Sequence, residues 1–155
     1  MMENKLPAKS AKRIKARKSA KARVMLCYSS EDGLPVRQVE GLLRRAGLDP
    51  VKDTYDLPVG MEIKEGMRLL VETSLMVVFV ISHPSALSPN CLFELEHARA
   101  LHMPIIPVTL QRGAVQHLPE WLRELKYEDL TGQPLEDAAV SIIGAVYQRL
   151  LADCA

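Results

Sequence analysis

The stretch LMVVFVI, Leu75–Ile81, is apolar at all seven of its positions. An unbroken apolar run of this length predicts a strand of a parallel sheet that is covered on both faces. Downstream, Ser88 and Pro89 form a typical helix start, with serine as N-cap and proline at the first helical position. This helix is expected to run to about His102, and a second buried strand is expected over Pro104–Leu110. A strand, a helix and another strand in this order indicate an α/β sheet.

The rest of the chain continues this alternation of strands and helices. Further strands are expected over Val24–Tyr28, over Leu48–Asp53 and, as a short edge strand, over Lys126–Leu130. Apolar residues recur at helical spacing in three other segments. These residues are Val36, Val39, Leu42, Leu43 and Ala46 before Gly47; Ile63, Met67, Leu70 and Val71; and Ala139, Ile142, Ile143, Val146, Tyr147 and Leu150.

Five strands that alternate with helices predict an α/β domain with an open parallel five-stranded sheet and helices on both faces, in flavodoxin-like order. The ligand crevice of such a sheet lies beyond the carboxyl ends of strands one and three, where the strand order reverses. Its expected borders are the loops Ser29–Gly33 and Ser82–Leu87. Thr54–Gly60 is predicted to be a loop, and residues 111–124 a loop with a short helix around Trp121, which is expected to serve in packing or partner contact.

Charge divides the 155 residues into two parts. Residues 1–23 hold nine Lys and Arg and one acidic residue. Residues 24–155 hold eleven Lys and Arg and eighteen acidic residues, which gives this part a net charge of −7. The sequence therefore predicts a basic flexible tail, 1–23, and one domain, 24–155. The tail favours either contact with an anionic partner or a solvated segment that aids solubility.

The apolar runs and the cysteines bear on location. No apolar run approaches the roughly 20 residues that span a bilayer, and no apolar stretch of a secretory signal follows the basic start. The expected location is cytoplasmic, without a transmembrane segment. Cys27, Cys91 and Cys154 lack the C-x-x-C spacing of redox or metal motifs and are expected to be free thiols.

Glu94 does not fit the apolar stripe of its own helix. At about 100° per residue and with Cys91 as zero, the stripe spans roughly −80° at Leu101 to +40° at Leu95. Glu94 falls inside it at about −60°, whereas Glu96 falls on the opposite side at about +140°. A carboxylate facing a sheet is costly unless it is paired or opens onto a polar cleft. The alternative is that Glu94 lies at the edge of the stripe and reaches solvent.

Several other chemistries lack support in the sequence. There is no G-x-G-x-x-G, no G-x-x-x-x-G-K-[ST] and no G-x-S-x-G. His83 and His97 lack the i, i+4 or clustered partners of metal ligands, so no metal site is predicted. A phosphoacceptor aspartate would be expected at the end of the third strand, where the chain has Ser82 and His83.

Four segments together resemble the Toll/interleukin-1 receptor (TIR) domain family, of prokaryotic type. VMLCYSSED, residues 24–32, is similar to the first box of the family, and DTYDLPVG, residues 53–60, to its BB loop. SPNCLFEL, residues 88–95, resembles the motif S-x-W-C-x-x-E-L, and PIIPV, residues 104–108, resembles the fourth strand. The resemblance covers roughly residues 23–150 and implies the fold described above.

The resemblance also implies a chemistry. In enzymatic TIR domains the glutamate of the motif cleaves the bond between nicotinamide and ribose in NAD⁺, and by position that glutamate is Glu94. NAD⁺ is then a substrate, and no cofactor is implied. The residues that the resemblance places around the nucleotide are Tyr28, Ser29, Asp53, Ser82 and Asn90. Asn90 departs from the family, because it stands where an aromatic residue usually walls the ligand pocket.

Two classes of function remain open, since TIR domains include enzymes and scaffolds. The first is an NAD⁺-consuming effector of prokaryotic immunity, activated by oligomerisation through loop 54–62 and gated by a separate sensor or activator protein. It would yield ADP-ribose or a cyclic form of it. The second is a non-enzymatic module for TIR–TIR interaction. A membrane-proximal signalling role based on the tail ranks below both, because the tail lacks an apolar anchor.

Overall fold

The sheet is parallel throughout and has the order β2-β1-β3-β4-β5 in a computed structural model that describes residues 21–52 and 57–153. This order is flavodoxin-like and confirms the predicted fold. The strands are β1 (Ala22–Cys27), β2 (Leu48–Val51), β3 (Met76–Ile81), β4 (Ile105–Thr109) and β5 (Glu128–Asp129).

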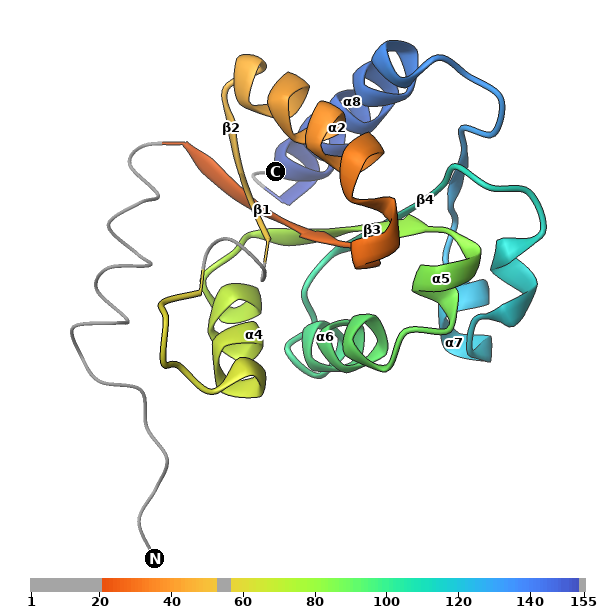
Figure 1. The fold of residues 1–155 in the computed structure, drawn as a ribbon. Helices are drawn as coiled ribbons and strands as arrows, with labels where there is room; N and C mark the ends of the chain where they lie inside the picture. Colours follow the sequence, from red (N-terminus) through yellow and green to blue (C-terminus); the bar gives the residue numbers. More distant parts are fainter. Residues whose placement is uncertain (1–20, 53–56, 154–155) are drawn as a thin grey trace, which may run out of the picture.

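Helices cover both faces of the sheet (Figure 1). One face carries α2 (Gly33–Arg45) and α8 (Leu135–Asp153). The other carries α4 (Ile63–Glu72), α5 (His83–Ala86), α6 (Pro89–Ala100) and α7 (Glu120–Arg123). Two 3₁₀ turns, η1 (Ser30–Asp32) and η2 (Ala114–His117), follow β1 and β4. No helix within the described ranges is both long and apolar enough to cross a membrane.

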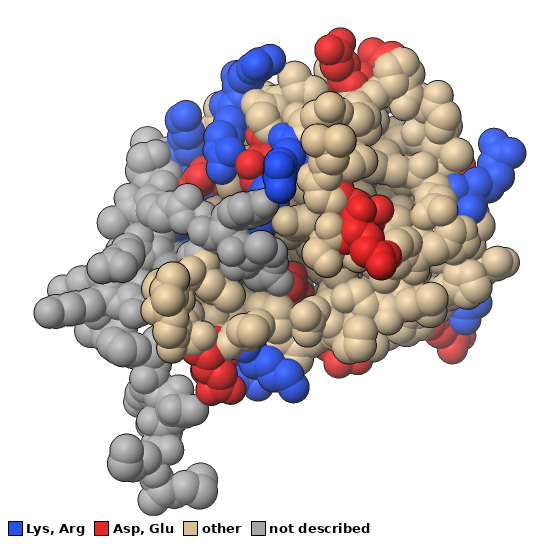
Figure 2. Space-filling view, in the orientation of Figure 1, with Lys and Arg blue, Asp and Glu red and all other residues tan. Residues whose placement is uncertain are grey.

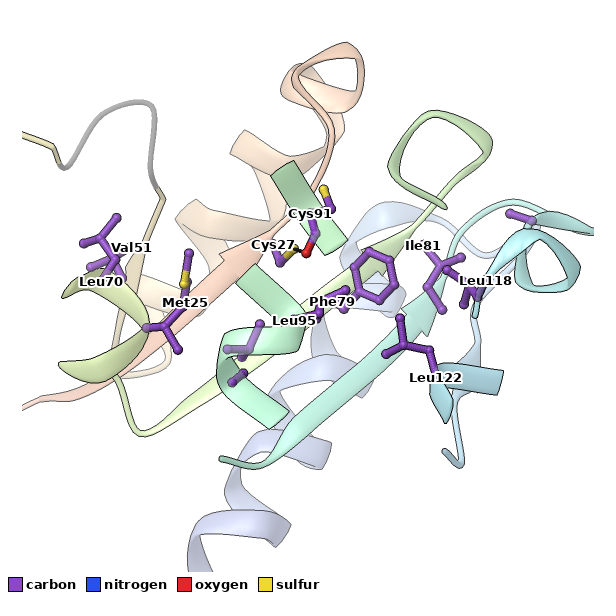
Figure 3. Close-up of a cluster of buried hydrophobic side chains, with 14 residues drawn as sticks. Met25, Cys27, Val51, Leu70, Phe79, Ile81, Cys91, Leu95, Leu118 and Leu122 are labelled. Atoms are coloured by element: carbon purple, nitrogen blue, oxygen red, sulfur yellow. Dashed lines mark hydrogen bonds between the residues drawn. The ribbon is translucent and has the colours of Figure 1, made fainter. Parts of the chain in front are cut away.

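Strand β3 lies at the centre of the core, and all six of its residues are at most 2% exposed. Val77, Phe79 and Ile81 face the cluster beneath α4 and α6, whereas Met76, Val78 and Val80 face α2 and α8. Figure 3 shows the first of these clusters, with the Phe79 ring beside Leu95 of α6. Burial on both faces explains why this strand reads as an unbroken apolar run.

The register of β1 and β3 places the predicted crevice. Leu26 pairs with Val78, and Cys27 pairs with Phe79, so the two strands reach the same edge of the sheet. Their connections then leave to opposite faces, because β1 leads into α2 and β3 leads into α5 and α6. The strand order therefore reverses between β1 and β3, as expected.

Strand β1 begins two residues before the expected Val24. Arg23, which the sequence analysis counted with the basic tail, is 1% exposed. Its Nη1 donates a hydrogen bond of 2.9 Å to Thr73 Oγ1, and its Nε lies 3.7 Å from Asp49 Oδ2. These partners explain how a buried arginine is tolerated. At the other end, Tyr28 lies just outside the strand.

Three further expectations differ from the structure. Segment 82–87, predicted to be a loop, contains helix α5, because Ser82 and Ser85 form a capping box and a proline occupies its first turn. Leu101, predicted to be buried, is 45% exposed because α6 ends at Ala100. Strands β2 and β5 are shorter than predicted.

Candidate functional site

Glu94 is 4% exposed, on the face of α6 that packs toward the sheet. Glu96, two residues later, is exposed. The helix that places them begins where the sequence indicates, since the Ser88 hydroxyl accepts a hydrogen bond of 3.2 Å from the Cys91 amide and Pro89 follows the cap. The buried position of Glu94 is thus confirmed, and the alternative that it reaches solvent is wrong.

The first turn of α6 lies against the carboxyl end of β1. Cys27, the last residue of β1, donates a hydrogen bond from its Sγ to the Cys91 carbonyl, 3.7 Å away (Figure 3). One turn further along the helix is Glu94, and next to it Leu95 packs into the core cluster around Phe79. The carboxylate therefore belongs to the turn of α6 that follows the edge where the crevice is expected.

Polar and aromatic contacts fix α6 against α4. The Phe93 ring lies beneath two cations of α4, with Lys64 Nζ 5.5 Å and Arg68 Cζ 5.2 Å from its centroid. Further along, His97 Nε2 lies 3.0 Å from Glu72 Oε1. Contacts on both sides of Glu94 thus limit movement of its helix relative to α4, the helix that follows loop 54–62.

Ser82 joins the two loops that border the crevice. Its hydroxyl donates a hydrogen bond of 2.5 Å to Asp32 Oδ2 and accepts one of 3.1 Å from the Ser85 amide. Ser29, on the loop after β1, accepts a hydrogen bond of 3.3 Å from the Glu31 amide and caps η1. Both serines therefore shape the crevice loops, and the hydroxyl hydrogen of Ser82 is engaged by Asp32.

Tyr28 lies on the other side of the sheet from α6. Its ring packs against the cluster beneath α2 and α8, and Lys52 Nζ lies 5.9 Å from the ring centroid. Lys52 is 2% exposed and forms an ion pair of 2.6 Å with Glu40 Oε2. The sequence does not mark Lys52 as a buried residue, because lysine is rarely buried unless it is paired.

Two site candidates remain, and the structure describes only one of them, Asn90. Asn90 is exposed and lies one turn before Glu94 on the same side of α6, at the solvent end of that face. Asp53 lies outside the described residues, as do the first residues of loop 54–62.

The histidines support no metal centre in the part of the chain that the structure describes, where no cluster of three or more His, Cys, Asp or Glu side chains could hold an ion. His97 pairs with Glu72. His83 stacks edge-on against His117, with ring centroids 5.5 Å apart. Both contacts are of kinds found at protein surfaces without a ligand.

Charge on the molecular surface is unevenly distributed. In the face shown in Figure 2, Lys and Arg side chains gather beside α2 and β2, and broad areas carry no charge. Helix α2 supplies Arg37, Arg44 and Arg45 to the described surface.

Fold and site together define a flavodoxin-like domain that buries one glutamate on the helix after its third strand, next to the point where the strand order reverses. The chain belongs to the TIR domain family, whose model matches residues 24–143. A comparison with curated protein sequences finds no significant match.

Solved structures of TIR domains are similar to this chain. The TIR domain of the Toll-related receptor TRR-2 from Hydra magnipapillata has a TM-score of 0.63 at 21% identity, over 84% of this chain and 95% of that one. The TIR domains of the activated Roq1 resistosome, which recognises the pathogen effector XopQ, have a TM-score of 0.66 at 19% identity. The match covers 81% of this chain and 99% of that one. The structure of the RPS4 and RRS1 TIR domain heterodimer has a TM-score of 0.59 at 17% identity. The match covers 83% of this chain and 96% of that one. At these identities the likeness establishes the fold.

Proposed function

We propose that this domain hydrolyses NAD⁺ at the bond between nicotinamide and ribose, with Glu94 as the catalytic carboxylate. The observation that carries the proposal is the burial of Glu94 on the helix that follows the switch point of the sheet. Burying a carboxylate is costly. Side chains kept in such costly positions concentrate at functional sites.

The reaction suits a single carboxylate. The bond between C1′ of the ribose and the pyridinium nitrogen breaks with both electrons going to the nitrogen, so nicotinamide leaves neutral without a general acid. Positive charge develops on the ribose, and a carboxylate beside it stabilises that charge and orients the ribose hydroxyls. Water then adds to C1′ and releases a proton, which gives ADP-ribose. If a nucleophilic atom of the same ADP-ribosyl group bonds to C1′ in place of water, a cyclic form results instead.

The proposed assembly uses loop 54–62. In its described part, Val59 is fully exposed, and Ile63, at the start of α4, is 64% exposed. Exposed apolar side chains close together in the sequence favour contact with a protein surface. The RPS4–RRS1 heterodimer and the Roq1 resistosome are assemblies in which TIR domains take part. We propose that the present chain likewise assembles, as a homo-oligomer. A separate sensor or activator protein would trigger this assembly.

The test compares two glutamates of one helix. Glu94→Gln keeps the size of the buried side chain and removes its charge, and Glu96→Gln makes the same change on the exposed side of α6. Purified full-length variants are incubated with NAD⁺ over a range of protein concentrations, with and without a crowding agent, and nicotinamide is quantified. We expect release that rises more than proportionally with concentration, is lost in Glu94→Gln, and persists in Glu96→Gln.

Equal activity of Glu94→Gln and the parent chain would overturn the catalytic assignment. Far-UV circular dichroism and the unfolding midpoint must match between the two variants, because replacing a buried charge can also alter stability. If assembled parent protein releases no nicotinamide, the second candidate function takes its place.

That second candidate is a non-enzymatic TIR–TIR interaction module. Asn90 favours it, because this exposed residue stands in place of the aromatic expected to wall the pocket. In this case Glu94→Gln leaves assembly and partner binding unchanged, whereas a charge at Val59 abolishes them.

We propose that the basic tail contacts an anionic partner through its cations before β1; Arg23, predicted to belong to this tail, is excluded because its side chain is buried in the sheet. For the whole chain we propose a cytoplasmic location. Deleting residues 1–20 leaves β1 intact, because the strand begins at Ala22. Loss of binding to anionic vesicles, nucleic acid or the activator after this deletion supports the proposal. Unchanged binding to all three contradicts it.

A further inference from the structure

A pocket lies at the amino edge of the sheet, where α6 ends and β4 begins. It has a volume of about 470 Å³. Its floor is apolar, formed by Met103, Ile105, Trp121 and Leu125, all of which pack against the core cluster. Known sites for small ligands are mostly apolar concavities of about 300 to 1,000 Å³ with a few polar groups at defined positions.

Basic side chains form the rim of this pocket. Arg99 from α6, His102 after it and Arg149 from α8 line it, against the single acid Glu124. The surrounding domain has the opposite charge, since residues 24–155 hold eleven Lys and Arg and eighteen acids. A local excess of positive charge in an acidic domain selects for an anion.

One of these cations, Arg99, lies over an aromatic ring that also lines the pocket. The Arg99 guanidinium stacks on the Trp121 ring, with Cζ 4.6 Å from the ring centroid. A guanidinium over an indole ring combines a planar cationic surface with several N–H donors. Planar bases stack on such surfaces, and phosphate oxygens accept hydrogen bonds from arginine N–H groups.

His102 has an unfavourable backbone conformation for a residue with a side chain, and that side chain lines the rim of the pocket. Among the residues that the structure describes, His102 is the one non-glycine residue with a positive φ, 56°. It terminates α6, with its amide bonded to the Arg99 carbonyl at 3.0 Å and the Met103 amide bonded to the Ala98 carbonyl at 2.9 Å. Glycine adopts this conformation without strain and is usual at such helix ends. Histidine here adds an imidazole next to Arg99.

The pocket is separate from the proposed NAD⁺ site. Ile105 is the first residue of β4, so the pocket lies at the amino ends of the strands, whereas the crevice lies at their carboxyl ends. We propose that this pocket is a binding site for a mononucleotide, with its base stacked on the Arg99–Trp121 pair and its phosphate bound by the arginines and His102. The proposal is independent of NAD⁺ hydrolysis.

Trp121 provides a direct test because it is the only tryptophan in the chain. The full-length protein is titrated with AMP, with adenosine and with inorganic phosphate, and Trp121 fluorescence is recorded; calorimetry gives the affinity independently. We expect AMP to change the fluorescence saturably. Adenosine and phosphate, each of which lacks one half of the proposed contacts, should bind about tenfold more weakly or not at all.

Matched arginine variants complete the test. Arg99→Ala/Arg149→Ala removes two rim charges, and Arg112→Ala/Arg123→Ala removes two exposed charges that do not line the pocket. The first pair should weaken AMP binding by about tenfold or more, and the second by less than about twofold. No saturable response to AMP up to millimolar concentration, equal binding of adenosine, or equal effects of the two variants would each overturn the proposal. AMP titration measures binding and the NAD⁺ assay measures nicotinamide release, so failure of the NAD⁺ assignment is distinguishable from failure of this one.

Discussion

The Ser82 hydroxyl donates a hydrogen bond to Asp32 Oδ2, 2.5 Å away across 50 residues of sequence. The two residues belong to the segments that leave β1 and β3 toward opposite faces of the sheet. This hydrogen bond therefore connects the segments after β1 and β3 at the switch point of the sheet, where the chain leaves toward opposite layers of helices. Ser82 also accepts a hydrogen bond from the Ser85 amide, so the contact is tied to the start of α5.

We expect Ser82 and Asp32 to be energetically coupled. Ser82→Ala should lower the free energy of unfolding by about 1–2 kcal/mol, because it removes a cap and a hydrogen bond, and Asp32→Ala by about 1 kcal/mol. The double variant should lose less than the sum, with a coupling of about 0.5–1.5 kcal/mol. Urea unfolding of all four proteins measures this, and strict additivity would show that the contact contributes nothing.

Val59 should control assembly without affecting the fold. Val59→Lys places a charge on a fully exposed side chain, so its unfolding free energy should stay within about 0.5 kcal/mol of the parent. Assembly measured by sedimentation should weaken, together with the concentration-dependent rise in nicotinamide release. Val140→Lys, on the 67% exposed Val140 of α8, is the control and should assemble normally. Equal assembly of the two variants would exclude the loop as the contact.

We expect the lack of a side chain at Gly66 to allow the segment before α4 to pack closely against this helix. A Cβ at Gly66 would lie 2.5 Å from Leu57 Cδ2 and 3.0 Å from Met61 Sδ. Gly66→Ala should therefore displace these side chains, and its gain in helix propensity, about 1 kcal/mol, should be offset by overpacking. We expect weaker assembly with an unfolding free energy within about 1 kcal/mol of the parent.

Gly144→Ala is the control for Gly66→Ala. Apart from its chain neighbours and the backbone of its own helix, no heavy atom lies within 4 Å of the position that its Cβ would occupy in α8. This variant should be more stable by about 0.5–1 kcal/mol in urea unfolding and should assemble like the parent. If Gly66→Ala behaves in the same way, Leu57 and Met61 accommodate the methyl group and the close approach has no role in assembly.

Tyr147 links the last helix to the end of α2. Its hydroxyl donates a hydrogen bond of 2.7 Å to the Ala46 carbonyl, just before Gly47, whose φ is 90°. Tyr147→Phe should lower the free energy of unfolding by about 0.5–1.5 kcal/mol and leave the far-UV spectrum unchanged. Thermal or urea unfolding measures this, and an unchanged midpoint would show that water replaces the hydroxyl without cost.

The fold could be predicted from the sequence because local and global signals agree along most of the chain. The apolar run at β3 indicates a doubly covered strand. The Ser88 cap indicates where α6 begins, and the apolar periodicity from Cys91 to Ala98 places Glu94 on its buried side. The prediction that Leu101 is buried is wrong, because it extends the same periodicity past Ala100, where α6 ends. Periodicity predicts which side of a helix is buried but marks its end less well.

Buried charges could not be predicted in the same way. Arg23 and Lys52 are at most 2% exposed, yet residue type alone predicts that both lie at the surface. Their partners Asp49 and Glu40 come from other elements, so only the assembled sheet brings each pair together. The pocket around Trp121 depends likewise on the approach of α7 and α8, which no local pattern encodes.

The burial of Arg23 has a consequence for proteolysis. A protease specific for basic residues needs an accessible side chain and a backbone that is free to bend into its active site. Lys21 is exposed and precedes the sheet, whereas Arg23 lies inside β1 with its guanidinium bonded to Thr73. Trypsin should therefore spare the bond after Arg23 and cleave no further into the domain than Lys21, so the folded sheet itself limits how short the N-terminus of a trimmed domain becomes.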